Sequence, residues 1–134
     1  MSGAAKGEAG QYSPMGSIIN EIPAEHVYIH CGYVDMRMSI DGLAAVVKQG
    51  FKHDMNGRNL YLFCGKRSDR FKALYYDGDG YILLYKRLQS GRYQWPRRGA
   101  DAKLLTARQL RWLLEGLSIE QPKALTSAVP KFII

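Results

Sequence analysis

Short apolar runs and helix-spaced apolar positions alternate along the chain and predict the elements of a small domain. Residues 27–31 (VYIHC) form a β-branched and aromatic run that stops at Gly32, which is typical of a short strand. Residues 60–64 (LYLFC) form a second run of the same kind. Each run is too short for a helix of ordinary length, so both are predicted to be strands.

Two other segments have apolar residues at helical spacing. Between Ser39, a suitable N-cap, and Gly50, a natural stop, the apolar positions 40, 43, 44 and 47 share one helical face. Thr106 and Gln109 match a capping box, and leucines follow at positions 110, 113, 114 and 117. Both segments are therefore predicted to be amphipathic helices.

The clearest hairpin joins residues 71–76 to residues 81–88 through the turn at 77–80 (DGDG). This turn sets the cross-strand register, which pairs Tyr76 with Tyr81, Leu74 with Leu83, Lys72 with Tyr85 and Arg70 with Arg87. Alternation places these eight side chains on one face. The better core lies on the opposite face, which carries Phe71, Ala73, Tyr75, Ile82, Leu84 and Lys86. Residues 92–95 are predicted to return briefly as a further strand before Pro96.

The order of these elements predicts an α+β fold. We expect a small antiparallel sheet of about four to five strands with two helices packed on one face. Residues 1–26 are predicted to be a flexible leader, residues 27–119 the single domain, and residues 120–134 a tail. The apolar end of that tail, residues 132–134, could dock on the body or on a second copy of the chain, and the oligomeric state stays open.

The 134-residue chain has no apolar run long enough to span a membrane and no secretory signal pattern, so we expect a cytoplasmic protein. Cys31 and Cys64 each end an apolar run and are predicted to be buried free thiols.

Positive charge is concentrated in one part of the chain. The net charge is +7, and residues 58–98 hold ten Lys or Arg but three Asp, whereas the remainder has equal numbers of each sign. Such a concentration favours a polyanionic partner such as DNA, and a merely solubilising surface is the alternative. The predicted phosphate contacts are Arg58, Lys66, Arg67, Arg70, Lys72, Arg87, Arg92, Arg97 and Arg98, with Tyr85 or Tyr93 as stacking candidates.

One detail of the hairpin bears on this interpretation. Arg70 and Arg87 face each other, and two like charges directly opposite destabilise a strand pair unless an anion lies between them. Asp69 could supply that anion, and so could a nucleic-acid phosphate.

Catalytic and metal-binding alternatives have weaker support. Asp77 and Asp79 suit a Gly-rich turn without any metal, so a two-metal nuclease is disfavoured. The spacing of the candidate zinc ligands matches no closed Cys/His pattern; these are His26, His30, Cys31, His53 and Cys64. No activated nucleophile stands out, and we expect no cofactor, no metal and no enzymatic activity.

Three ordered stretches resemble a known family. They read CGYVDMR leading into SIDGLA (31–44), LFCGKRSDRFK leading into YDGDG, KRL and GRYQWP (62–96), and LTARQL with LLEGL (105–117). Together they are similar to the second-frame accessory protein of the insertion-sequence 66 family, often called TnpB, a name shared with an unrelated RNA-guided nuclease. Met38 stands where the family often has a basic residue, and Tyr75 and Tyr76 where a Trp is common.

The resemblance, which covers residues 27–119, implies a context in bacterial transposable elements. Such elements encode a separate, larger transposase, which would supply the catalysis. The chain is then expected to be a non-catalytic accessory protein of transposition that binds DNA through a basic face, with transposon ends as the candidate site. The alternative is a protein-interaction module that docks the transposase or another accessory protein, and a metal-dependent nuclease is a third reading.

Overall fold

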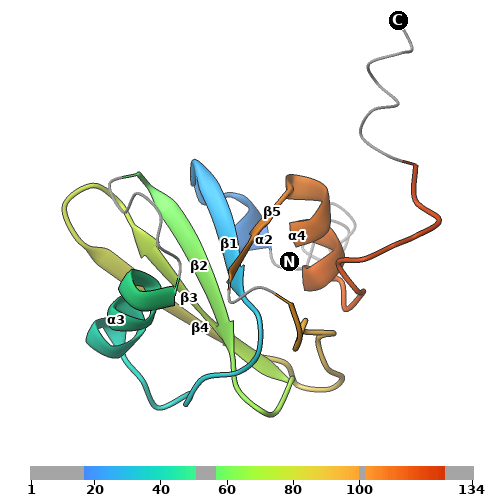
Figure 1. The fold of residues 1–134 in the computed structure, drawn as a ribbon, viewed down its shortest axis with the longest axis horizontal. Coiled ribbons are helices and arrows are strands. Elements are labelled where there is room, and N and C mark those ends of the chain that lie inside the picture. Colours follow the sequence, from blue (N-terminus) through green and yellow to red (C-terminus); the bar gives the residue numbers. More distant parts are fainter. Residues whose placement is uncertain (1–16, 51–56, 100–101, 126–134) are drawn as a thin grey trace, which may run out of the picture.

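The computed structural model describes residues 17–50, 57–99 and 102–125, which form five strands and three helices (Figure 1). In chain order these are α2 (Ser17–Asn20), β1 (His26–His30), α3 (Ile40–Gly50), β2 (Asn59–Cys64), β3 (Arg70–Tyr76), β4 (Tyr81–Arg87), β5 (Ala102–Leu105) and α4 (Ala107–Leu114). The predicted α+β class is confirmed, and so are the two amphipathic helices and the capping box at Thr106.

The strands form one mixed sheet with the order β4-β3-β2-β1-β5. Strands β1 and β2 are parallel, while the β2–β3, β3–β4 and β1–β5 pairs are antiparallel. The prediction of an antiparallel sheet was therefore wrong for the first pair. Helix α3 follows β1 and precedes β2 in the sequence, and a helical crossover of this kind normally connects two parallel neighbouring strands.

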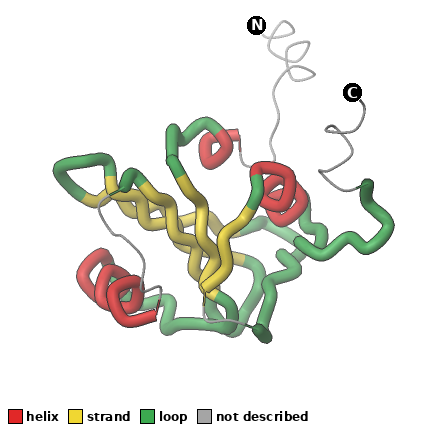
Figure 2. The backbone as a smooth tube through the Cα atoms, turned by 45° about the horizontal axis from the view of Figure 1, so that its top comes forward, coloured by secondary structure: helices red, strands yellow, loops and turns green. Residues whose placement is uncertain are grey.

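The helices cover both faces of the sheet, so the prediction of two helices on one face was wrong (Figure 2). Helix α3 packs on one face, where Leu43 and Val47 meet Phe63 and Leu74. Helices α2 and α4 pack on the other face. The reason lies in β2, whose six residues are all buried, because a strand that is apolar on both sides needs a cover on both sides.

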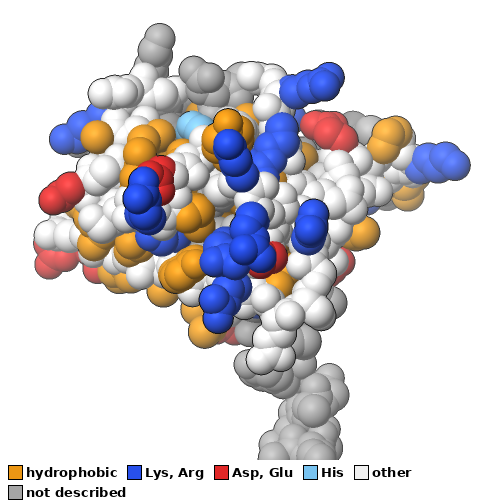
Figure 3. Space-filling model, turned by 90° about the horizontal axis from the view of Figure 1, so that it is seen from below, with side chains coloured by type: hydrophobic (Ala, Val, Ile, Leu, Met, Phe, Trp, Pro, Cys, Tyr) orange, Lys and Arg blue, Asp and Glu red, His pale blue; other side chains and the backbone are white. Residues whose placement is uncertain are grey.

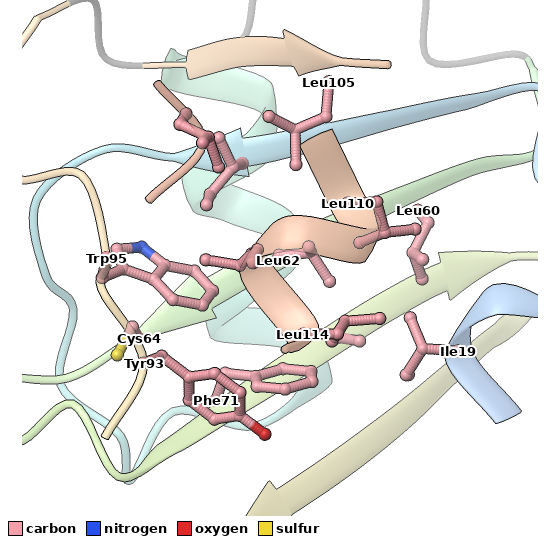
Figure 4. Close-up of a cluster of buried hydrophobic side chains, with 14 of the residues drawn as sticks. Ile19, Leu60, Leu62, Cys64, Phe71, Tyr93, Trp95, Leu105, Leu110 and Leu114 are labelled. Atoms are coloured by element: carbon pink, nitrogen blue, oxygen red, sulfur yellow. The ribbon is translucent and has the colours of Figure 1, made fainter. Parts of the chain in front are cut away.

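The larger core lies under α4 (Figure 4). Leu110 and Leu114 of this helix point toward Leu60 and Leu62 of the central strand β2. This face of the hairpin is the one that the sequence predicts to be core, and Phe71 on it is only 1% exposed, but Ile82 on the same face is 44% exposed and Leu74 on the opposite face is fully buried. The predicted hairpin register is confirmed at each pair, from Tyr76 with Tyr81 to Arg70 with Arg87.

Part of the predicted leader belongs to the folded body. Residues 17–20 form α2, and Ile19 is buried in the larger core (Figure 4). The Tyr75 hydroxyl donates to the Pro23 carbonyl, and the Glu25 amide donates to the Arg58 carbonyl at 2.7 Å. The prediction of a leader therefore fails for residues 17–26, while residues 1–16 lie outside the described residues, as do residues 126–134 of the predicted tail.

Two further predictions need correction. Residues 92–95 do not form a strand, although Tyr93 and Trp95 pack into the core, and the edge strand β5 was not predicted. Cys64 is fully buried, but Cys31 is only half-buried; both are free thiols. Within the described ranges, no helix has the length and apolar character that a membrane crossing requires.

Candidate nucleic-acid interface

Three loops meet at the end of the sheet where β1, β2 and β4 finish and β3 begins (Figure 1). They are residues 31–39, 65–69 and 88–98, and we call this region the loop end. Backbone hydrogen bonds of 2.7–2.9 Å join the three loops to one another and to the strands. They run from Gly32 N to Pro96 O, Val34 N to Cys64 O, Leu88 N to Asp69 O and Tyr93 N to Ser68 O.

The Arg97 side chain links all three loops. Its Nη1 donates to the Gly32 carbonyl at 2.8 Å, and its Nη2 donates to the Gly65 carbonyl at 2.8 Å and to Ser68 Oγ at 3.0 Å. These bonds use the edge of the guanidinium that a phosphate would need. We therefore assign Arg97 a structural role in the loop end rather than a direct phosphate contact.

Most of the predicted cations lie on the surface of the loop end. Figure 3 views the molecule from this side and shows Lys and Arg side chains gathered across the face, with few acids between them. The exposed members are Lys66, Arg67, Arg87, Arg92 and Arg98. The structure therefore brings together cations from the β2–β3 loop, from the end of β4 and from the segment that follows it.

The acids of these loops are already paired. Asp35 binds Arg37 at 2.7 Å, and Asp69 binds Arg70 at 2.8 Å and Arg67 at 3.7 Å. No ion pair within the described ranges neutralises the remaining exposed cations, Lys66, Arg87, Arg92 and Arg98. The loop end therefore presents uncompensated positive charge.

Asp69 also supplies the anion that the like-charge pair of Arg70 and Arg87 in the hairpin requires. Arg70 lies opposite Arg87, and the Asp69 carboxylate accepts two hydrogen bonds from the Arg70 guanidinium, at 2.8 and 3.1 Å. These bonds lower the pKa of Asp69 to about 2 and raise the pKa of Arg70. The acid that offsets Arg70 is thus part of the fold, while Arg87 has no acid partner among the described residues.

Lys72 and Tyr85 form a second polar group on the α3 side of the hairpin. Lys72 Nζ donates to the Met38 carbonyl at 2.6 Å and lies 5.4 Å from the Tyr85 ring centroid. The Tyr85 ring is 55% exposed, and its hydroxyl accepts a hydrogen bond from Arg70 Nη1 at 3.4 Å. Tyr85 thus stays a stacking candidate, whereas Lys72 is already bound to the 31–39 loop.

The structure separates Tyr93 and Arg58 from this surface. Tyr93 is 3% exposed and packs edge-on against Phe71, with ring centroids 5.2 Å apart. Its burial raises the pKa of its hydroxyl to about 12, and its ring is closed to a base, so the stacking prediction for Tyr93 was wrong. Arg58 lies at the opposite end of the sheet, next to Gly78 in the hairpin turn.

Sequence reasoning missed Tyr33, an exposed aromatic residue in the loop end. Its ring is 55% exposed, with Lys66 Nζ 5.3 Å and Arg97 Cζ 5.9 Å from the ring centroid. The sequence did hold one sign of it: Tyr33 follows Gly32 in the loop between the predicted strand at residues 27–31 and the predicted helix that begins after Ser39. Loops of this kind often carry binding residues. That signal does not reveal the two cations, which come from distant parts of the chain.

The acids considered for a nuclease and the buried thiol considered as a zinc ligand have structural explanations. The Asp77 carboxylate accepts from the Asp79 and Gly80 amides and so closes the hairpin turn. The Cys64 thiol donates to the Arg70 carbonyl, and burial raises its pKa. In the part of the chain that the structure describes, no three His, Cys, Asp or Glu side chains are grouped so that they could hold a metal; His53 lies outside that part.

Comparison with known proteins gives one family. Residues 25–124 match the model of a family described as "IS66 Orf2 like protein". Two relatives from Sinorhizobium fredii are both titled uncharacterized proteins. The first, y4hO, is 34% identical over 97 residues, which are 72% of this chain and 84% of the relative. The second, y4jC, is 33% identical over 84 residues, which are 63% and 72% of the two chains. No solved structure matches.

Proposed function

Because the chain belongs to the family of IS66 Orf2-like proteins, we propose that it assists transposition of an insertion sequence by binding DNA through the loop end. The family places the chain in the context of an insertion sequence and its transposition machinery. In this proposal the protein acts in the cytoplasm and has no catalytic activity of its own. The transposase performs the chemistry, and the accessory protein holds or presents DNA.

The observation that supports DNA binding is that cations without ion-pair partners among the described residues cluster on one surface. Lys66, Arg87 and Arg92 are exposed and lie on three different segments that backbone hydrogen bonds hold together. A solubilising surface does not require its charges to meet, but a phosphate-binding surface does. Each phosphate that is neutralised releases counterions, so several cations on one face give binding that depends strongly on salt.

The character of these groups also predicts how selective the binding is. Flexible Lys and Arg side chains without a helix or ribbon to enter a groove contact the backbone rather than base edges. We therefore expect affinity that varies little between sequences, with any preference for a transposon end arising from shape or from a partner. The transposase is the natural source of such selectivity.

The test is fluorescence anisotropy with labelled duplexes that carry a transposon end or a scrambled sequence, at low and high salt. We expect both duplexes to bind at low salt and to dissociate as salt rises. A variant with Lys66, Arg87 and Arg92 all changed to Gln should bind much more weakly. Wild-type protein that binds neither these duplexes nor single-stranded DNA at low salt would reject the proposal.

The protein-interaction alternative has lost part of its support. One basis for it was a hairpin with two usable faces, but α3 packs on one face at Leu74 and Leu83, and the core occupies the β3 part of the other, so that only β4 leaves apolar side chains exposed, at Ile82 and Tyr85. The second basis was the apolar tail, which lies outside the described residues. A transposase pull-down that survives nuclease treatment would revive this alternative, and it is the next experiment if DNA binding fails.

A further inference from the structure

Tyr33 is held at a fixed position although its side chain is exposed. The amides on either side of it are both bound: Gly32 N donates to Pro96 O, and Val34 N donates to Cys64 O, each at 2.9 Å. Arg97 also donates to the Gly32 carbonyl at 2.8 Å. The backbone around Tyr33 is thus tied to the end of β2 and to the 88–98 loop, so its ring is presented by a rigid support rather than by a mobile loop.

The surroundings of the ring suit a nucleotide. Gly32, Tyr33, Lys66 and Arg97 line a hollow of about 360 Å³ that is open to solvent, which is within the range of small-ligand sites. Tyr33 is exposed, and the Lys66 ammonium lies over its ring at 5.3 Å from the centroid and has no acid partner among the described residues. A base that takes the place of Lys66 over the ring, with its phosphate bound by the displaced ammonium, would satisfy both groups.

A second exposed tyrosine lies at the other end of a row of cations. From Tyr33 the row passes through Lys66 and Arg67, continues through the Arg67–Asp69 and Asp69–Arg70 ion pairs, and ends where Arg70 meets the Tyr85 hydroxyl. Each ring has a Lys ammonium close by, at 5.3 Å for Tyr33 and 5.4 Å for Tyr85. Aromatic side chains that alternate with cations are the usual means of holding a single strand.

We infer that the loop end is a site for unpaired DNA, in which Tyr33 stacks on a base whose phosphate is bound by Lys66. This inference rests on the proposed function, because it assigns the form of DNA that the same surface binds. A base inside a duplex is already stacked on its neighbours and cannot cover a tyrosine ring. Stacking on Tyr33 therefore adds affinity for single strands and none for duplexes.

The experiment compares three labelled probes by fluorescence anisotropy at low salt: a short oligothymidylate, an abasic oligonucleotide of the same length, and a duplex. The proteins are the wild type, Tyr33→Ala, Tyr33→Phe and Tyr33→Leu. We expect Tyr33→Ala to weaken binding of the oligothymidylate about tenfold. It should leave binding of the abasic and duplex probes nearly unchanged, because those probes offer no unpaired base that could stack on the ring. Tyr33→Phe keeps the ring and should keep the affinity, whereas Tyr33→Leu should behave like Ala.

The outcomes separate this inference from the proposed function. If Tyr33→Ala binds all three probes as the wild type does, while neutralising Lys66, Arg87 and Arg92 weakens binding of all three, the stacking site is wrong and the DNA-binding surface stands. If the wild type binds none of the probes, both fail. Thermal unfolding of each variant checks that it is folded. Tyr33→Leu keeps an apolar side chain but has no ring, so a loss of oligothymidylate affinity in Tyr33→Ala and Tyr33→Leu, but not in Tyr33→Phe, identifies stacking.

Discussion

The loop end and the opposite, hairpin-turn end of the sheet are built from the same strands but have different charge and different roles. At the loop end, Lys66, Arg87 and Arg92 are exposed, and none has an ion-pair partner among the described residues. At the hairpin-turn end, Asp77 accepts backbone amides within a tight turn and Arg58 is the local cation. The first arrangement leaves charge available for a partner, and the second uses its polar groups to close a turn.

The comparison shows that position in the fold, rather than position in a charged segment, decides which cations can act together. Arg58 belongs to the basic segment of the sequence, yet it lies at the far end of β2 from Lys66. Arg97 lies within the loop end, yet its guanidinium is occupied by protein acceptors.

The largest effect is expected at Arg97. Replacing it with Ala leaves the Gly32 and Gly65 carbonyls and Ser68 Oγ without their donor, which should lower the free energy of unfolding by about 2–3 kcal/mol. Thermal unfolding measures this loss. Arg98→Ala is the matched control, because the neighbouring side chain is exposed and should change stability very little. Equal losses in the two variants would contradict the structural role of Arg97.

The second effect concerns the hairpin-turn end. Gly78 has φ +110°, and a Cβ there would also lie 3.1 Å from the Arg58 guanidinium, so Gly78→Ala should cost about 1–2 kcal/mol of stability. Gly80→Ala should cost much less, because Gly80 has ordinary φ and open space around its Cβ position. DNA affinity measured on the folded variants should not change. A loss of affinity in Gly78→Ala would show that this end also contributes to binding.

A smaller effect is expected when an acid is removed from the loop end. Asp69→Asn frees Arg67 and Arg70 from their ion pairs and raises the local positive charge, so DNA affinity at low salt should rise roughly threefold. Asp79→Asn makes the same change in net charge at the hairpin-turn end and should leave affinity unaltered. A similar rise in both variants would mean that only net charge matters.

The smallest effect is a pH dependence of stability at Asp69. Its pKa is lowered to about 2 from an ordinary 3.8 by hydrogen bonds from Arg70. A depressed carboxyl pKa stabilises the fold above the unfolded-state pKa, and that contribution disappears as the pH falls through about 2. The difference in melting temperature between wild type and Asp69→Asn should therefore be larger at pH 5 than at pH 2, because the carboxylate becomes protonated as the pH falls through about 2. A difference that is the same at both pH values would contradict the ion pair.

Local signals in the sequence predicted local structure well. The hairpin register follows from one turn and the alternation of side chains, and the capping box at Thr106 follows from two residues three positions apart. The parallel pairing of β1 with β2 could not be obtained in this way, because it depends on where α3 places the chain. The continuous apolar run of β2 was the one sign that both faces would be covered.

The candidate site was predicted only in part for the same reason. Charge counting found the cations of the loop end but could not separate Arg58, which differs only in its position along β2. Tyr93 was predicted to be a stacking candidate within a short strand, whereas residues 92–95 are irregular and pack Tyr93 into the core beside Phe71. Tyr33, Lys66 and Arg97 come from three different loops, so no local sequence pattern could predict that they lie together.

The most direct test of the account is the salt dependence of DNA affinity for two matched triple variants. One changes Lys66, Arg87 and Arg92 to Gln at the loop end, and the other changes Lys48, Arg58 and Lys123 to Gln elsewhere. The slope of log affinity against log salt should fall by about three in the first and stay at the wild-type value in the second. Equal slopes in the two variants would show that net charge, rather than the loop end, binds the DNA.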